Sequence, residues 1–133
     1  MKFSKAIKTY IVISESASVT EAYAAEKLSY YLGKIFGIEA ETVTSADGKE
    51  GNFISLGGPE RNAYTAKFIS EAEFDKIVPG PEGIFIKSYA NTLVIAGTTK
   101  CPNDFERPTL YALYEFLERY LGASFAAYHS PIR

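Results

Sequence analysis

The densest group of reactive side chains lies in the stretch RPTLYALYEFLERYLG, residues 107–122. Glu115 and Glu118 lie about one helical turn apart, and a pair of carboxylates is what acid–base cleavage of a glycosidic bond requires. The same spacing places both on the polar face of a predicted amphipathic helix, with Arg119 beside them. Such a face normally turns to water, so we interpret the stretch as scaffold.

Three other features have reactive residue types, and a structural interpretation is favoured for each. His129 alone has an ordinary pKa near neutrality, but catalysis would need a partner group held beside it by the fold, so a surface or interface histidine is expected. Cys101 precedes Pro102 and has no flanking base to activate its thiol. Residues 57–61, GGPER, follow a predicted strand as phosphate-binding loops do. They lack the GxGxxG and P-loop patterns, which favours a strand-ending turn.

The tyrosines have two competing interpretations. The chain has 10 tyrosines, and aromatic rings can stack on sugars or fill cores. Six of them fall on predicted strand or helix positions: Tyr10, Tyr23, Tyr30, Tyr31, Tyr111 and Tyr114. The sequence leaves both uses open. No set of nucleophile, base and orienting group is present, so no catalytic residue, metal or cofactor is predicted.

Composition narrows the class of protein. The 133 residues suit one domain, 1–133, and 47% apolar residues support a core. A net charge of −2 without a Lys/Arg block argues against nucleic acid as a partner, and one Cys and one His cannot form a zinc site. The apolar run Tyr10–Ile13 is too short for a signal-peptide core, and no window suits a membrane helix. A soluble chain is expected, and an export signal of a secreted or periplasmic parent would lie outside it.

The first half of the chain alternates strand and helix patterns. Residues 9–13 are β-branched and aromatic, which predicts a buried strand. Ser18 and Glu21 form an S-x-x-E capping box that begins a helix ending near Gly37. Apolar residues recur at helical spacing within it: Ala24, Leu28, Tyr31, Leu32 and Ile35. Strands are predicted at 39–44 and 53–56.

The second half predicts a hairpin and a last helix. Residues 60–69 have helical character, whereas 70–78 are left unassigned. Residues 83–89 and 92–96 predict two strands joined at Ala90-Asn91. A helix is predicted from Pro108 to Gly122, with a strand after it at 123–127. Leu110, Leu113, Tyr114, Leu117 and Leu121 form its apolar stripe. We predict an α+β fold, a two-layer α/β sandwich whose mixed sheet carries both long helices on one face.

A set of segments in this order resembles a known family. They are YIVI (10–13), EAYAAEKLSYYL (21–32) with FGI (36–38), FISLG (53–57), EGIFI (82–86), LVIAG (93–97) and TLYALYEFLE (109–118) with LG (121–122). Together they resemble the N-terminal non-catalytic accessory domain of large glycoside hydrolases. That domain precedes the catalytic barrel in β-N-acetylhexosaminidases, α-glucuronidases and related bacterial proteins. The resemblance covers residues 9–122, and no single motif in it is diagnostic.

The resemblance implies a helix-covered sheet without catalytic residues of its own, packed on a barrel that carries the acid and base. Two departures stand out: Pro108 replaces the glycine that usually follows the arginine, and residues 123–133 diverge from the aromatic-rich passage into the barrel. We expect the partner barrel to contact an apolar or aromatic patch. Its candidate residues are Phe105, Arg107, Phe125, Tyr128 and His129.

Three functions follow in order of preference. The first is an accessory domain that stabilises the catalytic barrel of a carbohydrate-active enzyme, in the same polypeptide or a partner protein. The second is a stand-alone module that binds glycan or protein through exposed tyrosines. The third is a small enzyme that uses His129 with nearby carboxylates, which we disfavour because the sequence shows no catalytic set around it.

Overall fold

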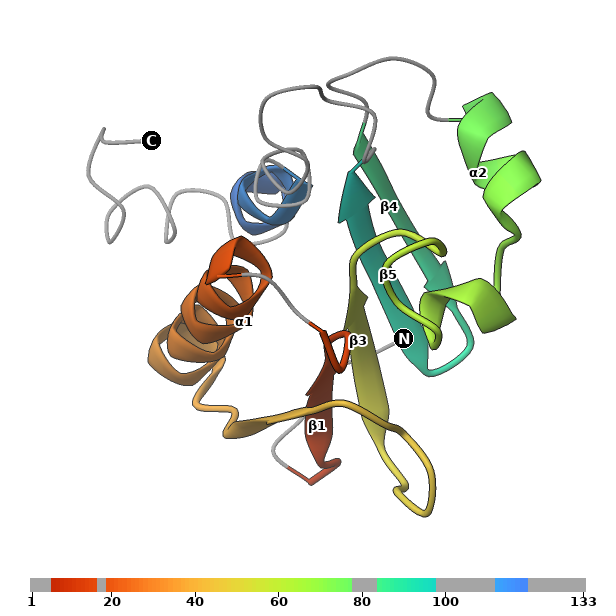
Figure 1. The fold of residues 1–133 in the computed structure, drawn as a ribbon. Coiled ribbons are helices and arrows are strands. Elements are labelled where there is room, and N and C mark those ends of the chain that lie inside the picture. Colours follow the sequence, from red (N-terminus) through yellow and green to blue (C-terminus); the bar gives the residue numbers. More distant parts are fainter. Residues whose placement is uncertain (1–5, 17–18, 78–83, 98–111, 120–133) are drawn as a thin grey trace.

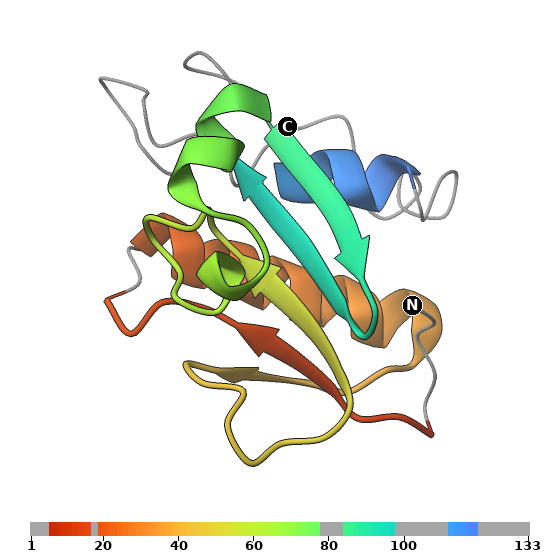
Figure 2. The ribbon, with the colours of Figure 1, turned by 90° about the vertical axis from the view of Figure 1, so that its right-hand side faces the viewer.

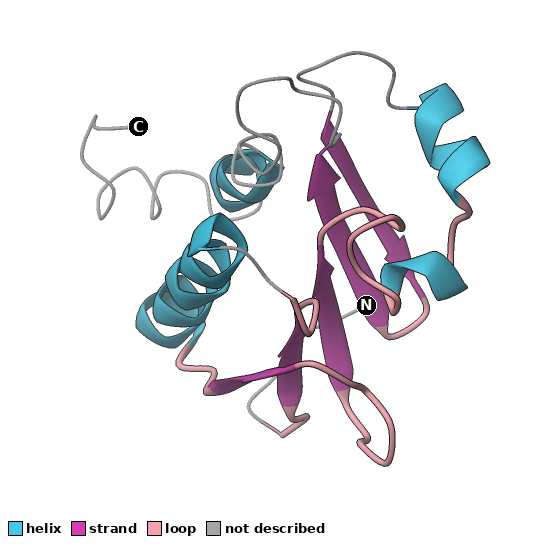
Figure 3. Ribbon diagram, viewed as in Figure 1, coloured by secondary structure: helices cyan, strands magenta, loops and turns pink. Residues whose placement is uncertain are grey.

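The computed structural model describes residues 6–16, 19–77, 84–97 and 112–119. These residues form a five-stranded sheet with helices against it (Figures 1 and 3). The elements are β1 (Thr9–Val12), α1 (Val19–Tyr31), η1 (Leu32–Phe36), β2 (Ala40–Val43), β3 (Asn52–Leu56), η2 (Thr65–Lys67), α2 (Glu71–Ile77), β4 (Ile84–Tyr89) and β5 (Thr92–Gly97). A helical segment at residues 112–119 follows. No helix in these ranges is both long and apolar enough to cross a membrane.

The sheet has the strand order β2-β1-β3-β5-β4. β2, β1, β3 and β5 pair in parallel, and the edge strand β4 runs antiparallel to β5. All predicted strands within the described residues are confirmed, with small differences at their ends, and so is the α+β class. The hairpin turns at Ala90-Asn91 as predicted, with Ala90 at a φ of 49°. The Asn91 amide donates to the Gly51 carbonyl oxygen at 2.9 Å and so ties this turn to the start of β3.

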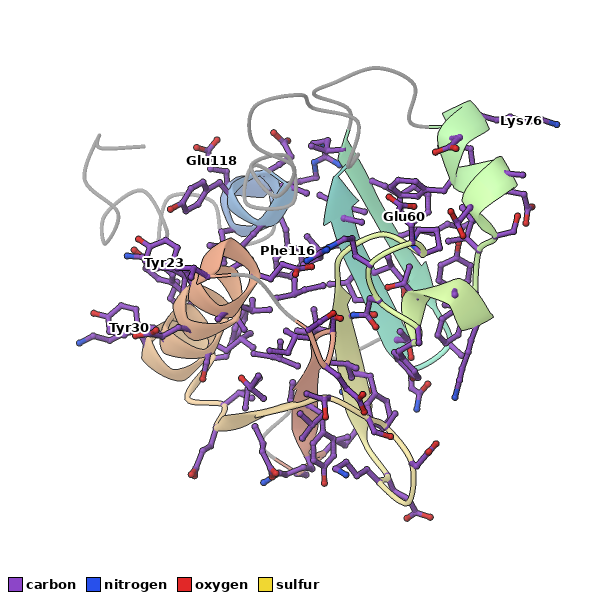
Figure 4. The ribbon with its side chains drawn as sticks, viewed as in Figure 1. Tyr23, Tyr30, Glu60, Lys76, Phe116 and Glu118 are labelled. Carbon is purple, nitrogen blue, oxygen red and sulfur yellow. The ribbon has the colours of Figure 1, made fainter. Side chains whose placement is uncertain are left out.

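The first face of the sheet packs against α1 and the helical segment 112–119, as predicted. Strand residues that alternate toward this face form one side of the core: Ile11, Ile54, Leu56, Leu93 and Ile95. The helices contribute the other side: Ala24, Leu28, Tyr31, Leu32, Ala112, Leu113, Phe116 and Leu117. Figure 4 shows Phe116 reaching from its helix toward the sheet. The predicted apolar stripes therefore bury against the sheet wherever the structure describes them.

The first helix ends as its sequence predicts, at Gly37. α1 continues into the π-helical turn η1, and Gly37 then takes a left-handed φ of 67°. The N–H of Gly37 donates to Gly33 O and that of Ile38 to Leu32 O, each at 3.1 Å. This arrangement pairs carbonyl groups that a helix end would leave unsatisfied.

The second face of the sheet is partly covered by η2 and α2 (Figure 2). A smaller apolar cluster lies beneath them: Ile69, Phe74, Phe85, Val94 and Ala96. The sequence pattern does not assign α2, yet Ser70 caps its first turn. The Ser70 Oγ accepts the N–H of Glu73 and donates to the Glu73 carboxylate, each at 3.2 Å.

The predicted helix at 60–69 is wrong for most of its length. Only Thr65–Lys67 form a short 3-10 turn, and the residues before them are turns. The reason is that side chains there bond to the ends of β1 and β3 instead of supporting a helix. The hydroxyl of Thr65 donates to Gly57 O at 2.8 Å and lies 2.6 Å from the hydroxyl of Ser55.

The buried side chain of Asn62 links the ends of two parallel strands. Its amide nitrogen donates to Val12 O at 3.0 Å and to Leu56 O at 2.8 Å. Its Oδ1 accepts the N–H of Tyr64 at 2.9 Å. Asn62 is 2% exposed, so water does not replace these bonds if the amide is removed.

Replacing this amide should therefore destabilise the fold. We expect Asn62→Ala to lower the free energy of unfolding by about 3 kcal/mol, because two buried carbonyl groups lose their donor. Asn91→Ala is the matched control, since its amide also bonds a carbonyl but is exposed, and it should cost about 0.5–1 kcal/mol. Urea unfolding followed by circular dichroism measures both. Equal losses would contradict the role given to Asn62.

Candidate functional site

A polar groove opens where three parallel strands end. The segments that follow β1, β2 and β3 converge there, because carboxyl ends of parallel strands lie at one edge of a sheet. Residues 13–16, residues 44–47, and residues 61–64 with Lys67 line it. The groove encloses about 470 Å³, which is within the range of small-ligand sites.

The groove lies at a point where the chain connections diverge. β1 leads into α1 on the first face of the sheet, whereas β3 leads into η2 and α2 on the second face (Figures 1 and 2). In open α/β sheets, ligands bind in the crevice at such a switch point. This placement makes the groove the candidate functional site.

Serine hydroxyls shape two of the loops around the groove. The Ser14 Oγ accepts the N–H of Ser16 at 3.1 Å, and the Ser45 Oγ accepts the N–H of Asp47 at 3.1 Å. These short-range bonds turn the backbone sharply just after β1 and shortly after β2. The lining is therefore rich in hydroxyl groups, with the carboxylate of Asp47 on one of its loops.

An ion pair joins α1 to the segment after β3. Glu21 lies in the first turn of α1, and its carboxylate accepts a hydrogen bond from the Arg61 guanidinium at 2.8 Å. The side chain of Glu21 is 2% exposed and that of Arg61 30% exposed. Gly57 has a φ of +105°, and a Cβ there would lie 3.1 Å from the Glu21 carboxylate, so a glycine leaves room for the pair.

The aromatic side chain of the groove, Tyr64, is held by contacts on several sides. Its hydroxyl lies 2.8 Å from the hydroxyl of Thr92. Its ring centroid lies 5.6 Å from that of Phe53 and 5.3 Å from that of Phe68. The ammonium group of Lys67 lies 5.6 Å from the same centroid, a cation–π distance. The ring is therefore fixed before any ligand arrives.

The groups of the groove suit binding better than catalysis. Its serines bond to backbone N–H groups, and no described serine in it bonds to a base that would activate it. Among the residues that the structure describes, no cluster of three His, Cys, Asp or Glu is placed to hold a metal ion. The groove offers hydrogen-bond donors and acceptors, together with side chains of both charge signs.

A second surface is formed by exposed apolar side chains on the outer face of α1 and η1. Val19 is 88% exposed and Tyr30 53%, and Tyr23 and Phe36 are also exposed. Figure 4 shows Tyr23 and Tyr30 pointing away from the sheet. Tyr114 of the helical segment 112–119 lies close to Tyr23. Burial raises the pKa of Tyr114, and the neighbouring Tyr23 raises it further. We call Val19, Tyr23, Tyr30 and Phe36 the α1 outer face.

The structure places several of the residues that the sequence analysis considered for a site. Glu115 and Glu118 lie on a scaffold helix, and Arg119 pairs with Glu115 at 2.9 Å on its exposed side. Residues 57–61 form the strand-ending turn that was expected. Tyr31 is buried in the core, Tyr10 and Tyr114 are half-buried, and Tyr23 and Tyr30 are exposed.

Other predictions fall outside the described residues. These are the interface candidates Phe105, Arg107, Phe125, Tyr128 and His129, together with Cys101, Tyr111, Ser18 of the capping box, both ends of the last helix and the strand at 123–127. They stay predictions.

Sequence reasoning missed the groove itself. Glu21 was read as a capping residue and Arg61 as part of a turn, and they are forty positions apart in the chain. A buried carboxylate needs a cation, but nothing local indicates which one. The sequence does contain one indication of the groove: polar residues follow the predicted strands at 9–13 and 53–56.

Comparison with known proteins identifies a structural neighbour but no family. No protein-family profile matches the chain, and no curated protein matches it. Among solved structures, the chain is similar to a GH115 4-O-methyl-α-glucuronidase with specificity for decorated arabinogalactans. The TM-score is 0.63 at 20% sequence identity, so the likeness is one of fold. The match covers 87% of this chain and 14% of the glucuronidase chain.

The Glu21–Arg61 pair should contribute much more to stability than an exposed pair. We expect Arg61→Met to lower the free energy of unfolding by about 2–3 kcal/mol, because it removes the positive charge beside a buried carboxylate. Arg119→Met, which breaks the exposed pair with Glu115, is the matched control and should cost about 0.5 kcal/mol or less. Urea denaturation compares the two variants. A similar small loss in both would rule out a structural role for the pair.

The raised pKa of Tyr114 predicts a loss of stability in alkali. A tyrosine with a higher pKa in the folded than in the unfolded chain stabilises the fold below a pH of about 10, and this contribution disappears as the pH rises through the folded-state pKa. Between pH of about 9 and 11, unfolding free energy should fall less steeply for Tyr114→Phe than for the unmodified chain. Parallel curves in urea titrations at several pH values would show the expectation to be wrong.

Proposed function

We propose that this chain is a non-catalytic accessory domain of a carbohydrate-active enzyme, which packs on and stabilises a catalytic barrel. One observation carries the proposal: the fold matches 14% of a glycoside hydrolase chain while 87% of this chain is matched. A fold that occurs as a small part of a large hydrolase fits a supporting role. The order and spacing of the segments described above favour the same family of domains.

The geometry at the strand ends supports the same role. In many α/β enzymes the switch point holds substrate or cofactor. Here the side chain of Asn62 bonds Val12 O and Leu56 O across it, and the Glu21–Arg61 pair lies beside it. Side chains that are already engaged in these structural bonds are poor candidates for general acid–base catalysis, which requires proton transfer to or from a reacting group.

The α1 outer face is the surface we propose for docking. Aromatic side chains are enriched in the buried centres of interfaces, and this face carries Tyr23, Tyr30 and Phe36 as well as the highly exposed Val19. Lys27 and Lys34 lie on the same helical unit, with the Lys27 ammonium 5.6 Å from the ring centroid of Tyr23. An apolar centre with charged neighbours is the usual anatomy of a protein–protein interface.

The proposal predicts a barrel with its own carboxylate pair, encoded with this sequence or beside it. Mixed with that barrel, the chain should co-elute in size-exclusion chromatography and raise the melting temperature of the barrel by about 2–8 °C. The double variant Val19→Ser/Tyr30→Ser should prevent both effects, because it removes the two most exposed apolar side chains of the α1 outer face.

The matched control is Ile77→Ser/Ile84→Ser, which changes two exposed apolar residues of α2 and β4. It should leave the complex intact. If no such barrel accompanies the sequence, the accessory role fails. If only the control variant disrupts the complex, the assignment of the docking surface fails.

A further inference from the structure

We propose that the groove beyond β1, β2 and β3 binds a neutral mono- or disaccharide. This inference goes beyond the accessory role and does not depend on it, because docking is assigned to the α1 outer face, none of whose residues lines the groove. The argument uses the place, the charge and the polar groups of the groove.

The place and size of the groove suit a small polar ligand. It lies at the switch point of the sheet and encloses about 470 Å³. Its floor is fixed, since Asn62 is tied to Val12, Leu56 and Tyr64 by hydrogen bonds. A ligand would therefore meet a preformed surface, which lowers the entropy lost on binding.

The charges of the lining favour a neutral ligand. Arg61 is paired with the buried carboxylate of Glu21, which leaves Lys67 as the other cation of the lining. Glu15 and Asp47 supply two carboxylates to the same groove. A phosphate or a uronate would meet more negative than positive charge, because like charges repel at short range.

The polar groups of the lining match the hydroxyl groups of a sugar. Ser16, Thr44 and Ser45 bring hydroxyls that can donate or accept, Asp47 can only accept, and Lys67 can only donate. A saccharide needs such a mixture, because each of its hydroxyls is both donor and acceptor.

Tyr64 also lines the groove, and its aromatic side chain is fixed by its neighbours. It is held between Phe53 and Phe68, and its hydroxyl contacts Thr92, so it stays in place without a ligand. Aromatic side chains of this kind present an apolar body beside a polar tip.

The test is a titration of the ¹⁵N-labelled 133-residue chain, followed by backbone amide resonances. Glucose, galactose, xylose, arabinose and lactose are the neutral probes, and glucuronate is the anionic one. At about 50 mM, a site with a Kd of a few millimolar is nearly full. We expect saturable shifts from a neutral sugar in residues 13–16, 44–47 and 61–67.

Variants then locate the site. Asp47→Ala and Lys67→Ala should each weaken binding about tenfold, because each removes a charged hydrogen-bonding partner. Both residues are exposed, so the variants should fold. Lys87→Ala is the matched control: this lysine lies 5.1 Å from the ring centroid of Tyr89, outside the groove, and its removal should leave the Kd unchanged.

Three results would overturn the proposal. One is the absence of shifts with every neutral sugar. Another is tighter binding of glucuronate than of any neutral probe. The third is an equal loss of affinity in Lys67→Ala and Lys87→Ala. None of these results bears on whether a barrel docks at the α1 outer face, so the two proposals fail separately.

Discussion

The bonds of one buried amide hold the centre of this fold together. β1 and β3 are parallel neighbours whose connections leave on opposite faces of the sheet, so backbone carbonyls at their ends open into a crevice. Such groups must be paired when water is excluded. Asn62 pairs Val12 O and Leu56 O with its amide nitrogen, and its oxygen accepts the N–H of Tyr64. The same turn therefore closes the crevice, places Tyr64 over the second face and directs Arg61 toward α1.

In many α/β proteins the switch point of the sheet both binds the ligand and carries the reacting groups. In this chain its innermost part is filled by Asn62 and bordered by the Glu21–Arg61 pair, and the open space lies outward, among loops rich in hydroxyl groups. The fold is similar to that of a portion of a GH115 α-glucuronidase. Hydrogen bonds and an ion pair thus fix the middle of this edge of the sheet, while polar loops remain exposed around it.

The sequence predicts the features that local physics controls. The β-branched run at 9–13 and the turn at Ala90-Asn91 are correct, and Gly37 ends the first helix, because each depends on neighbours in the chain. The stretch 60–69 fails because Asn62 bonds to the Val12 carbonyl of distant β1 and Thr65 bonds to the Gly57 carbonyl just after β3, which overrides a moderate helical propensity.

The candidate site was harder to predict than the fold. Glu21 satisfies the capping-box pattern, and nothing in that pattern indicates a partner as distant as Arg61. The sequence does not single out Tyr64, because its side chain is held in place by contacts with Phe53 and Phe68 that form only when the sheet assembles. By contrast, the interpretation of Glu115 as part of a scaffold helix was correct, because amphipathic spacing alone decides it.

The sheet itself has a consequence for how such a domain would work inside a larger enzyme. The groove opens at the carboxyl ends of its parallel strands, and none of the residues of the α1 outer face lines it. A sugar chain held weakly at the groove would stay tethered near a catalytic domain docked on the α1 outer face. Tethering of this kind raises the local concentration of a ligand to about the millimolar range. Weak affinity would then be an advantage, since a polymer must be released as readily as it is retained.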